Sequence, residues 1–336
     1  MSDKTKNVLV TGGAGFIGHA LIEHLLEETN YNIVSLDRLD VSGCLSRIAD
    51  VVAKDDRWKS RVKVVWHDLK APLNDHVVSS LGDINYILHL AASSHVNRSI
   101  EDPLSFVMDN VVGTCNLLNY AREISTRGTL EMFLYFSTDE VFGPAPEGVT
   151  FVEDDKYNAK NPYSASKAGG EELCNAYQNT YGLPIVITHT MNAYGPRQHL
   201  EKFIPIVIDK LQRNEKITIH SNKDGTKSSS RRYLFSKDVA KAVSFLMQNG
   251  QPGQKYNVCA DDETDNLTLA SLIAELMGKD LDYELSYPEK ERPGNDFRYS
   301  VSGKKLNDMG WKQEVSLRDG LKKTIDWYLQ NSEWGT

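Results

Sequence analysis

The chain has 336 residues, a formal net charge of −8, 40% hydrophobic and 25% charged residues. The length suggests two domains or one large domain with an added lobe, and the acidic balance argues against nucleic-acid binding. The four cysteines lie far apart without a C-x-x-C pair, which argues against a zinc site and a disulfide framework. Because neither a signal-peptide stretch nor a membrane-length apolar run is present, we expect a cytoplasmic protein that binds no membrane and no metal.

A glycine-rich turn follows the first expected strand. Residues 7–11 form a short apolar run, Gly-Gly-Ala-Gly-Phe-Ile-Gly occupies 12–18, and helical spacing follows over 19–26. This order is typical of a dinucleotide-binding turn, in which bare backbone and a helix N-terminus approach a pyrophosphate, whereas a flexible turn without a ligand is the alternative. The residues expected to contact the cofactor are Gly12, Gly15, Phe16, Ile17 and Gly18.

Acidic residues end the next two expected strands, at 31–36 and 62–66. Asp37 lies about 20 positions past the glycines, where a carboxylate binds the ribose hydroxyls of a dinucleotide. Its charge would repel a 2′-phosphate, which favours NAD over NADP, although Arg38 beside it weakens this preference. Asp68, followed by Leu69, is placed to meet the adenine, and a turn-forming role for Asp68 is the alternative.

Small and then polar residues follow a fourth expected strand at 85–90. Leu90, Ala91 and Ala92 would let a cofactor lie close to the backbone, and Ser94 and His95 come next. A histidine here can serve as a catalytic base, but without a visible partner we favour a binding or structural role for His95. A single helix is then expected from Asp102-Pro103 to residue 124, since Asp caps a helix and Pro suits its first position.

The fifth expected strand is an apolar and aromatic run at 132–136, and it ends in Ser137-Thr138-Asp139-Glu140. In an open α/β sheet, ligands bind beyond the carboxyl ends of the strands, so these two carboxylates are candidates for proton transfer. The alternative is a polar loop or a helix cap. The next helix is expected from 161 to 181 and places Tyr163 and Lys167 on one face. We expect Lys167 to lower the pKa of Tyr163, unless the pair is an ordinary surface contact.

The alternation of strands and helices predicts a Rossmann-type, doubly wound parallel sheet with a smaller C-terminal α/β domain. We expect a dinucleotide-binding domain at 1–190 and a mainly substrate-binding domain at 191–330, with some chain returning to the first domain. Further strands are expected at 184–190, 216–220 and 255–259, and helices at 268–277 and 317–329. Lys202, Arg231 and Arg292 fall in the second half, where a diphosphate would need positive charge.

These motifs together resemble the extended short-chain dehydrogenase/reductase family over nearly the whole chain. The resemblance rests on the glycine turn, His-Leu-Ala-Ala at 89–92, Asn-Val-Val-Gly-Thr at 110–114 and Tyr-x-x-x-Lys at 163–167. Within the family, Ser-Thr-Asp-Glu-Val-Phe-Gly at 137–143 is similar to the nucleotide-sugar 4,6-dehydratases. Departures at 93, 97, 191–193 and 232–233 lie near the expected hexose and nucleotide pockets, so the resemblance leaves the sugar and the base open.

The resemblance implies a hydro-lyase that binds NAD tightly and converts a nucleoside-diphosphate hexose to its 4-keto-6-deoxy form. It implies Tyr163 as base at C4, with Lys167 and Thr138 assisting, then Glu140 as base at C5 and Asp139 as acid at C6. It adds Asn110 to the cofactor site and suggests a homodimer packed through 103–124 and 164–181. The implied substrate-binding residues are Ser94, His95, Asn192, Glu201, Lys202, Arg231 and Arg292. A 5,6-dehydratase, a 4-epimerase and a non-catalytic NAD-binding module remain alternatives.

Overall fold

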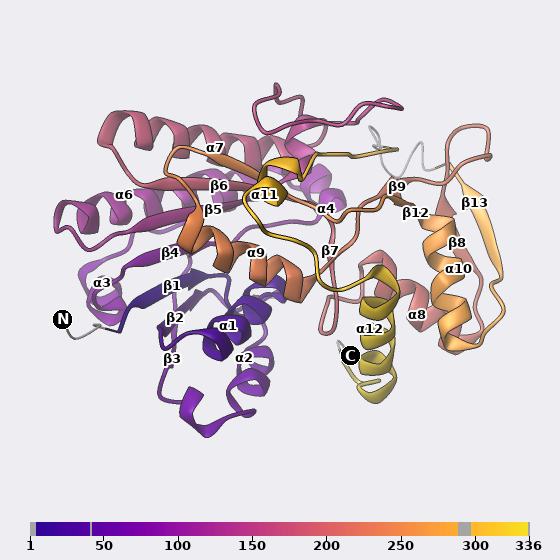
Figure 1. The fold of residues 1–336 in the computed structure, drawn as a ribbon, viewed down its shortest axis with the longest axis horizontal. Helices are drawn as coiled ribbons and strands as arrows, with labels where there is room; N and C mark the ends of the chain where they lie inside the picture. Colours follow the sequence, from indigo (N-terminus) through magenta and orange to yellow (C-terminus); the bar gives the residue numbers. More distant parts are fainter. Residues whose placement is uncertain (1–4, 41, 288–296, 335–336) are drawn as a thin grey trace.

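The structure, a computed structural model, describes residues 5–40, 42–287 and 297–334. Its centre is a parallel sheet of seven strands in the order β11-β6-β5-β4-β1-β2-β3 (Figure 1). The strands are β1 (Asn7–Thr11), β2 (Asn32–Asp37), β3 (Val62–Trp66), β4 (Tyr86–His89), β5 (Met132–Thr138), β6 (Ile185–Thr190) and β11 (Lys255–Val258). Each coincides with an expected strand to within two residues at either end.

Helices cover both faces of the sheet, as the apolar strand sequences require. One core layer joins the sheet to α1 (Phe16–Glu28), α2 (Leu45–Val52) and α9 (Ser236–Asn249). The other joins it to α3 (Asp75–Leu81), α6 (Gly113–Thr126) and α7 (Pro162–Tyr181). The predicted Rossmann-type fold is therefore confirmed. Within the described ranges, no helix combines the length and the apolar character needed to cross a membrane.

The helix expected over 102–124 is not a single α-helix. It consists of α5 (Pro103–Val107), a π-helical turn (Met108–Val112) and α6, and Asp102 caps α5 as expected. A further short helix, α4 (Val96–Glu101), precedes it. The wide π turn brings the side chain of Asn110 to the segment that follows β4. There Asn110 Oδ1 accepts from the Ser93 amide at 2.9 Å, and Asn110 Nδ2 donates to the Ser93 carbonyl at 2.9 Å.

A smaller lobe lies beyond the carboxyl ends of the strands (Figure 1). Its helices are α8 (Phe203–Arg213), α10 (Asn266–Met277) and α12 (Leu317–Gln330), and β8 (Ile217–His220) pairs in parallel with β13 (Tyr283–Ser286). These elements share a core of their own. Two small pairs, β7 (Ala193–Tyr194) with β10 (Leu234–Phe235) and β9 (Ser230–Arg231) with β12 (Thr264–Asp265), connect the lobe to the sheet region.

The chain returns from the lobe to the sheet. After β10 it forms α9, which packs against α1, and then β11, which pairs with β6 at the edge of the sheet. The short helix α11 (Lys304–Asp308) also packs on this side through Leu306. The carboxyl ends of the strands and the lobe thus face each other, and the space between them is where a ligand would bind.

Candidate active site

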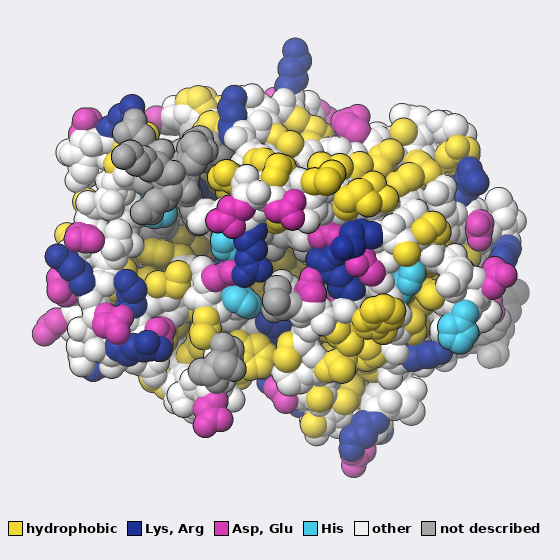
Figure 2. Space-filling view, turned by 180° about the vertical axis from the view of Figure 1, so that it is seen from behind, with side chains coloured by type: hydrophobic (Ala, Val, Ile, Leu, Met, Phe, Trp, Pro, Cys, Tyr) yellow, Lys and Arg dark blue, Asp and Glu magenta, His cyan; other side chains and the backbone are white. Residues whose placement is uncertain are grey.

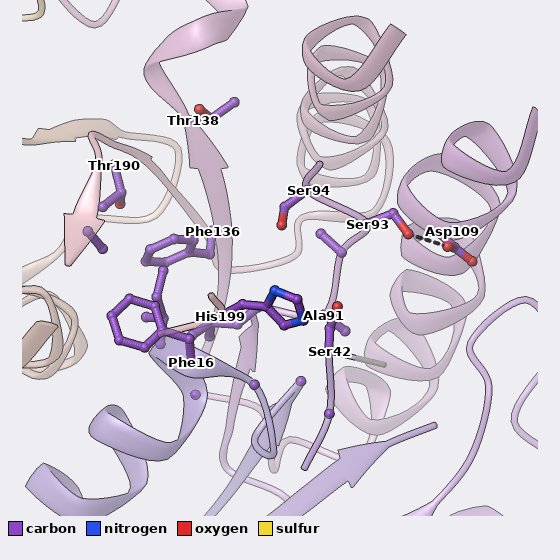
Figure 3. Close-up of a pocket in the computed structure, with 18 of the residues that line it drawn as sticks. Phe16, Ser42, Ala91, Ser93, Ser94, Asp109, Phe136, Thr138, Thr190 and His199 are labelled. Carbon is purple, nitrogen blue, oxygen red and sulfur yellow. Dashed lines mark hydrogen bonds between the residues drawn. The ribbon is translucent and has the colours of Figure 1, made fainter. Parts of the chain in front are cut away.

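A cavity of about 410 Å³ lies between the sheet and the lobe. Its wall is built from the carboxyl ends of β1 to β6, from α7, and from lobe residues between 198 and 204 with Tyr233. Figure 2 shows charged and histidine side chains gathered around a hollow in this face of the molecule. A view into the cavity shows Phe16, Ala91, Ser94, Phe136 and His199 around it (Figure 3).

The glycine turn forms a cradle that side chains would fill. Gly12 has a φ of +71°, and a Cβ there would lie 2.9 Å from Ala91 Cα. A Cβ on Gly18 would lie 2.1 Å from the Gly12 carbonyl oxygen. Gly15 begins α1 without a side-chain cap, so the first amides of the helix face the cavity beside Phe16 and Ile17. This arrangement suits a pyrophosphate, which a helix N-terminus and close backbone bind.

The ends of β2 and β3 carry the acids expected at the ribose and the adenine, and both line the cavity. Asp37 is buried, its carboxylate accepts from the Leu39 and Ala14 amides at 2.8 and 3.2 Å, and burial raises its pKa. Asp68 accepts from the Lys70 amide at 3.0 Å, which is the turn-forming role left open above. Its side chain nevertheless reaches the cavity, next to Leu69.

Arg38 is surrounded by carboxylates. Its guanidinium donates to both oxygens of Asp109 at 2.6 and 3.0 Å and to Asp40 at 2.6 Å, and it lies 3.9 Å from Asp68. A 2′-phosphate beside Asp37 would need a cation to neutralise it, and this cation is already engaged by acids. The geometry therefore supports the predicted preference for NAD over NADP.

The small residues after β4 line the cavity at Leu90, Ala91 and Ala92, as expected. Asn110, also expected at the cofactor, does not line it. Besides Ser93, its amide donates to Ser166 Oγ at 2.8 Å, so it joins the end of β4 to α7 from behind the cavity wall. The neighbouring Asp109 does line the cavity and accepts from Ser93 Oγ at 2.5 Å (Figure 3).

The two catalytic carboxyl candidates follow β5 in a 3₁₀ turn, Asp139–Phe142. Thr138 caps this turn, because its Oγ1 accepts from the Glu140 amide at 3.3 Å and donates to Asp139 Oδ1 at 3.2 Å. Asp139 is 3% exposed, and its buried Oδ2 has no hydrogen-bond partner among the residues that the structure describes. A buried polar atom without a partner is costly, so this oxygen is suited to bind a polar group of a ligand.

The pKa of Asp139 is raised to about 7, chiefly by burial and secondly by the adjacent charge of Glu140, while Arg231 and the hydrogen bond from Thr138 act in the opposite direction. Asp139 can therefore hold a proton near neutral pH and donate it, which is the behaviour that a general acid needs.

Glu140 is held by two residues that sequence reasoning did not assign to the site. Asn161 Nδ2 donates to Glu140 Oε2 at 3.2 Å, and the Tyr299 hydroxyl donates to the same oxygen at 3.3 Å. Both hydrogen bonds favour the ionised carboxylate, which can act as a base. Asn161 also caps α7, and the Asn-Pro pair that marked this helix start was a usable signal for it. Tyr299 lies in an irregular segment, and no sequence signal pointed to it.

Tyr163 and Lys167 both line the cavity from α7. The expectation that Lys167 lowers the pKa of Tyr163 is wrong for the chain's own residues: burial, followed by the charge of Glu140, raises the pKa of Tyr163, and only a hydrogen bond with Thr138 opposes this. Lys167 is 3% exposed, its Nζ lies 4.3 Å from the centre of the Tyr135 ring, and burial lowers its pKa to about 8. A phenolate at Tyr163 therefore needs an additional positive charge nearby.

Four of the seven residues expected to bind the substrate line the cavity: Ser94, Asn192, Glu201 and Lys202. His95 stands just outside it as the cap of α4, where its Nδ1 accepts from the Arg98 amide at 3.3 Å and its Nε2 lies 3.5 Å from Glu201. Arg98 binds Glu201 more closely, at 2.9 Å. Glu201 thereby joins the loop before α8 to α4 across the cavity mouth.

Arg231 does not line the cavity but acts at its edge. Its guanidinium donates to the carbonyls of Ser230 and Phe297 and lies 4.5 Å from the centre of the Tyr299 ring. Its charge reaches Asp139, as the pKa of that residue shows. Arg292, the remaining expected residue, lies outside the described residues.

A contact between the two halves of the molecule was also missed. Arg47 on α2 is buried, and its guanidinium donates to the carbonyl oxygens of Ala14, Ser42 and Arg197. Arg197 pairs in turn with Asp50 at 3.0 Å. This places residues 198 and 199 of the lobe over the glycine turn, although nothing in the sequence around Arg47 marks it as a residue of the site.

Comparison with known proteins identifies the family of the chain. The family model described as GDP-mannose 4,6 dehydratase matches residues 9–324. The dTDP-glucose 4,6-dehydratase of Escherichia coli is 34% identical over 97% of this chain and 94% of its own length. The dTDP-D-glucose 4,6-dehydratase of Bos taurus is 36% identical over 97% of this chain and 89% of its own.

Solved structures of similar proteins have the same fold as this chain. The dTDP-glucose 4,6-dehydratase of Streptomyces venezuelae, determined with NAD and a second ligand, has a TM-score of 0.86 at 31% identity, covering 98% of both chains. The UDP-glucose 4-epimerase of Thermus thermophilus, determined with NAD, has a TM-score of 0.84 at 28% identity, covering 96% of this chain and 99% of its own. By sequence, fold and site geometry, the chain belongs to the GDP-mannose 4,6 dehydratase family.

Proposed function

We propose that this protein is an NAD-dependent 4,6-dehydratase that converts a nucleoside-diphosphate hexose to its 4-keto-6-deoxy form. The observation that carries this proposal is the pair Asp139 and Glu140, adjacent in the chain but in different surroundings, in one cavity with Tyr163 and a dinucleotide cradle. Loss of water across C5 and C6 needs both a base and an acid, and the pair supplies them.

The cofactor is NAD, held by the glycine turn, by Asp37 and by the small residues after β4. When bound, NAD accepts a hydride from C4 of the sugar and returns one to C6 within the same turnover, so it is not consumed. Arg38 cannot serve a 2′-phosphate while Asp109 and Asp40 bind it. The relatives and the solved dehydratase structures with NAD support this choice.

Tyr163 removes the proton of the C4 hydroxyl. Its raised pKa means that Lys167 alone is not enough and that further positive charge is needed close to its hydroxyl, which bound NAD would supply. Thr138, whose hydroxyl donates to Asp139 in the structure, is proposed to turn this donation to the C4 oxygen when the substrate is bound. The base is therefore strong only once substrate and cofactor are assembled.

Glu140 and Asp139 divide the elimination between them. A ketone at C4 acidifies the C5 proton, and Glu140, kept ionised by Asn161 and Tyr299, removes it. Asp139, protonated up to about pH 7, gives its proton to the C6 hydroxyl, which leaves as water. Its unpartnered Oδ2 is the atom proposed to meet that hydroxyl.

Substrate binding is assigned to the lobe side of the cavity. Lys202 lines the wall and supplies a positive charge for the diphosphate, and Ser94 and Asn192 supply polar groups for the hexose. Arg231 and Arg292 are proposed to meet the nucleotide part, and His95 and Glu201 to fix the loop at the cavity mouth.

A homodimer in the cytoplasm, active in deoxysugar formation, completes the proposal. The face over α5 to α7 exposes Leu104, Val107 and Tyr181, and apolar side chains gather at the upper right of Figure 2, where α6 and α7 of Figure 1 lie. Burial of such a patch favours association. The four cysteines are free thiols, which suits a reducing compartment.

The test is incubation of the purified protein with UDP-, dTDP-, GDP- and CDP-glucose and with UDP-N-acetylglucosamine, followed by mass spectrometry and NMR. We expect one of these to lose one water and to show a C6 methyl group beside a C4 ketone, with no net reduction of NAD. Inversion at C4 without loss of mass would identify a 4-epimerase, and a C5–C6 alkene a 5,6-dehydratase; either would overturn the proposal.

A further inference from the structure

A carboxylate lies completely buried behind the active site. Glu171, on α7 one turn past Lys167, is 0% exposed and does not line the cavity. Lysine and glutamate four residues apart share one face of a helix. An ionised carboxylate is costly to bury, so its presence beside a catalytic lysine needs an explanation.

Three donors satisfy this carboxylate. Ser137 Oγ donates to Glu171 Oε1, and the Tyr157 hydroxyl donates to Oε2. His189 Nε2, on β6, lies 3.1 Å from Oε2. These hydrogen bonds and the histidine's charge lower the pKa of Glu171 despite its burial, so the residue is ionised. Ser137 directly precedes Thr138, so its hydrogen bond to Glu171 fixes the end of β5 at the point where the catalytic residues begin.

His189 completes this network from β6. Its Nδ1 lies 2.9 Å from Asn257 Oδ1, and its Nε2 faces Glu171. The orientation of the Asn257 amide is fixed because its Nδ2 donates to the carbonyl of Ser302 at 3.1 Å. The histidine ring is therefore held between Asn257 and Glu171.

Among the described groups around Lys167, Glu171 is the carboxylate that affects the pKa of this lysine. From β5, Tyr135 presents its ring and stays neutral, since burial raises its pKa. From β4, His89 is neutral because burial lowers its pKa to about 3. On α7 itself, burial raises the pKa of both Tyr163 and Cys174, so neither carries a charge there. Glu171 opposes the effect of burial on the pKa of Lys167.

On the Glu171 side, the packed elements add two further groups. His189 faces it from β6, and Tyr157 faces it from the loop after the 3₁₀ turn. Lys255 on β11 donates to the Tyr157 hydroxyl at 2.6 Å. Several partners thus share the charge of Glu171. Glu171 nevertheless raises the pKa of Lys167 more than any other charged group that acts on this lysine.

We propose that Glu171 is a positioning residue of the dehydratase: it anchors Ser137 at the end of β5 and places a buried carboxylate one helical turn from Lys167. The inference rests on the proposed function, in which the ammonium of Lys167 helps Tyr163 to lose its proton. Loss of the charge on Glu171 makes Lys167 release its proton at lower pH, and Tyr163 then loses its support in mildly alkaline solution.

The test compares the pH dependence of kcat/KM for the wild type and Glu171→Gln. We expect the alkaline limb of the variant to move to lower pH by about one unit, which is roughly a tenfold loss of activity above the wild-type midpoint. Tyr157→Phe removes one hydrogen bond to Glu171 but keeps its charge, so its alkaline limb should stay in place.

A second measurement does not depend on turnover. The protein is labelled with ¹³C at lysine Cε, the Lys167 signal is assigned by its loss in Lys167→Met, and its titration is followed by NMR. The midpoint should fall in Glu171→Gln and not in Tyr157→Phe. Equal midpoints and equal limbs in all three proteins would overturn the proposal, as would the same shift in Tyr157→Phe. Absence of turnover in the wild type would instead count against the proposed function and leave this titration valid.

Glu171→Gln replaces the buried carboxylate that accepts from Ser137 and Tyr157, which threatens folding. The double variant Glu171→Gln/His189→Gln replaces the carboxylate and the imidazole by two neutral amides that can hydrogen-bond each other. It should fold and show the same lowered midpoint for Lys167, and a midpoint equal to that of the wild type would refute the proposal.

Discussion

Asp139 and Glu140 are neighbours in the chain, yet their side chains lie in different surroundings. Asp139 is buried, and no donor among the described residues binds its Oδ2, whereas Glu140 accepts hydrogen bonds from the amide of Asn161 and the hydroxyl of Tyr299. Burial favours the neutral acid, and donated hydrogen bonds favour the anion. The division into acid and base is therefore a property of the surroundings and not of the residue types.

The base is tested by Glu140→Gln. The amide cannot remove the C5 proton, so dehydration should fall by about 10² to 10⁴-fold, the usual contribution of a general base. Oxidation at C4 does not need Glu140 and should continue. Reduced cofactor should then accumulate on the enzyme, measured by its near-ultraviolet absorbance in a single turnover.

Glu147→Gln, which changes an exposed carboxylate that lies 3.9 Å from Lys227, is the matched control and should behave as wild type. Product formation by Glu140→Gln at nearly the wild-type rate would mean that another group removes the C5 proton.

The acid is tested through stability. The pKa of Asp139 in the folded protein, about 7, lies above its ordinary value of 3.8. Below pH 3.8 the residue is protonated in both the folded and the unfolded state. Between pH 3.8 and about 7 the unfolded state releases its proton while the folded state keeps it, so the free energy of unfolding falls over this range and stays at the lower level above pH 7. Asp139→Asn should therefore raise the free energy of unfolding at pH 8 to 9, by up to about 4 kcal/mol at roughly 1.4 kcal/mol per pH unit.

Thermal melts from pH 4 to 9 measure this effect. The difference from the wild type should vanish near pH 4, and Asp224→Asn, at an exposed position, should show no such trend. A constant difference at all pH values would contradict a buried, titrating Asp139. In a Glu140→Gln background the gain should shrink, because the neighbouring charge contributes to the shift.

At the residue scale, sequence reasoning located most of the cavity wall. The glycines, Asp37, Thr138 to Glu140, Tyr163 and Lys167 stand at strand ends or on a helix face, and strand ends meet at one edge of a parallel sheet. Tyr299 could not be located in this way, since it comes from an irregular segment that reaches Glu140 only through the tertiary fold. The sign of the Tyr163 pKa was also wrong, because burial cannot be read from residue spacing.

Among the elements, the N-terminus of α7 links helix formation to catalysis. Asn161 accepts from the Ser164 amide at 2.8 Å through Oδ1 and donates to Glu140 through Nδ2. Ser164 Oγ in turn accepts from the Asn161 amide, which completes a capping box. One side chain thus fixes both the start of the helix that carries Tyr163 and the catalytic base.

Asn161→Asp separates these roles. Aspartate still accepts from the Ser164 amide, so the melting temperature should change little. It cannot donate to Glu140 and adds a like charge beside it, so kcat should fall by about tenfold or more. Asn161→Ala should lose activity and also about 1 kcal/mol of stability.

Asn74→Asp makes the same change at the cap of α3, where Asn74 accepts from the Val77 amide at 3.0 Å, and it should leave kcat unchanged. Wild-type turnover by Asn161→Asp would show that Glu140 does not depend on this hydrogen bond.

The π turn in the second expected helix shows where element prediction from sequence ends. The Asp-Pro start of α5 was recognisable because capping is local. The extra residue at Met108–Val112 is stabilised by contacts of Asn110 with Ser93 and Ser166, which lie on other elements. Such contacts leave no local periodicity, so a continuous helix was the natural expectation.

For the whole molecule, the doubly wound sheet was predictable from the alternation of apolar strands and helices. The lobe was less so, because β7, β9, β10 and β12 are two residues long and give no periodic pattern. The division into 1–190 and 191–330, with some chain returning to the first domain, stays a prediction. The sheet takes its last strand, β11, from the second half, and α9 covers α1.

A fragment of residues 1–190 should therefore not fold alone. Without β11 the backbone of β6 keeps its pairing with β5 but becomes an exposed edge, and without α9 the apolar side of α1 at Leu25 and Leu26 is left open to water. Circular dichroism and gel filtration should show aggregation or an unfolded chain. Co-expression with residues 191–336 should restore a complex, whereas cooperative melting of 1–190 alone would contradict the prediction.

The return of the chain through α9 and β11 also limits how this enzyme can be re-engineered. Replacing everything after residue 190 by the matching part of a relative would import a foreign edge strand and a foreign helix against β6 and α1. A chimaera aimed at new sugar specificity should instead be assembled in pieces, exchanging the lobe on either side while the native segment 236–258 stays with its own sheet.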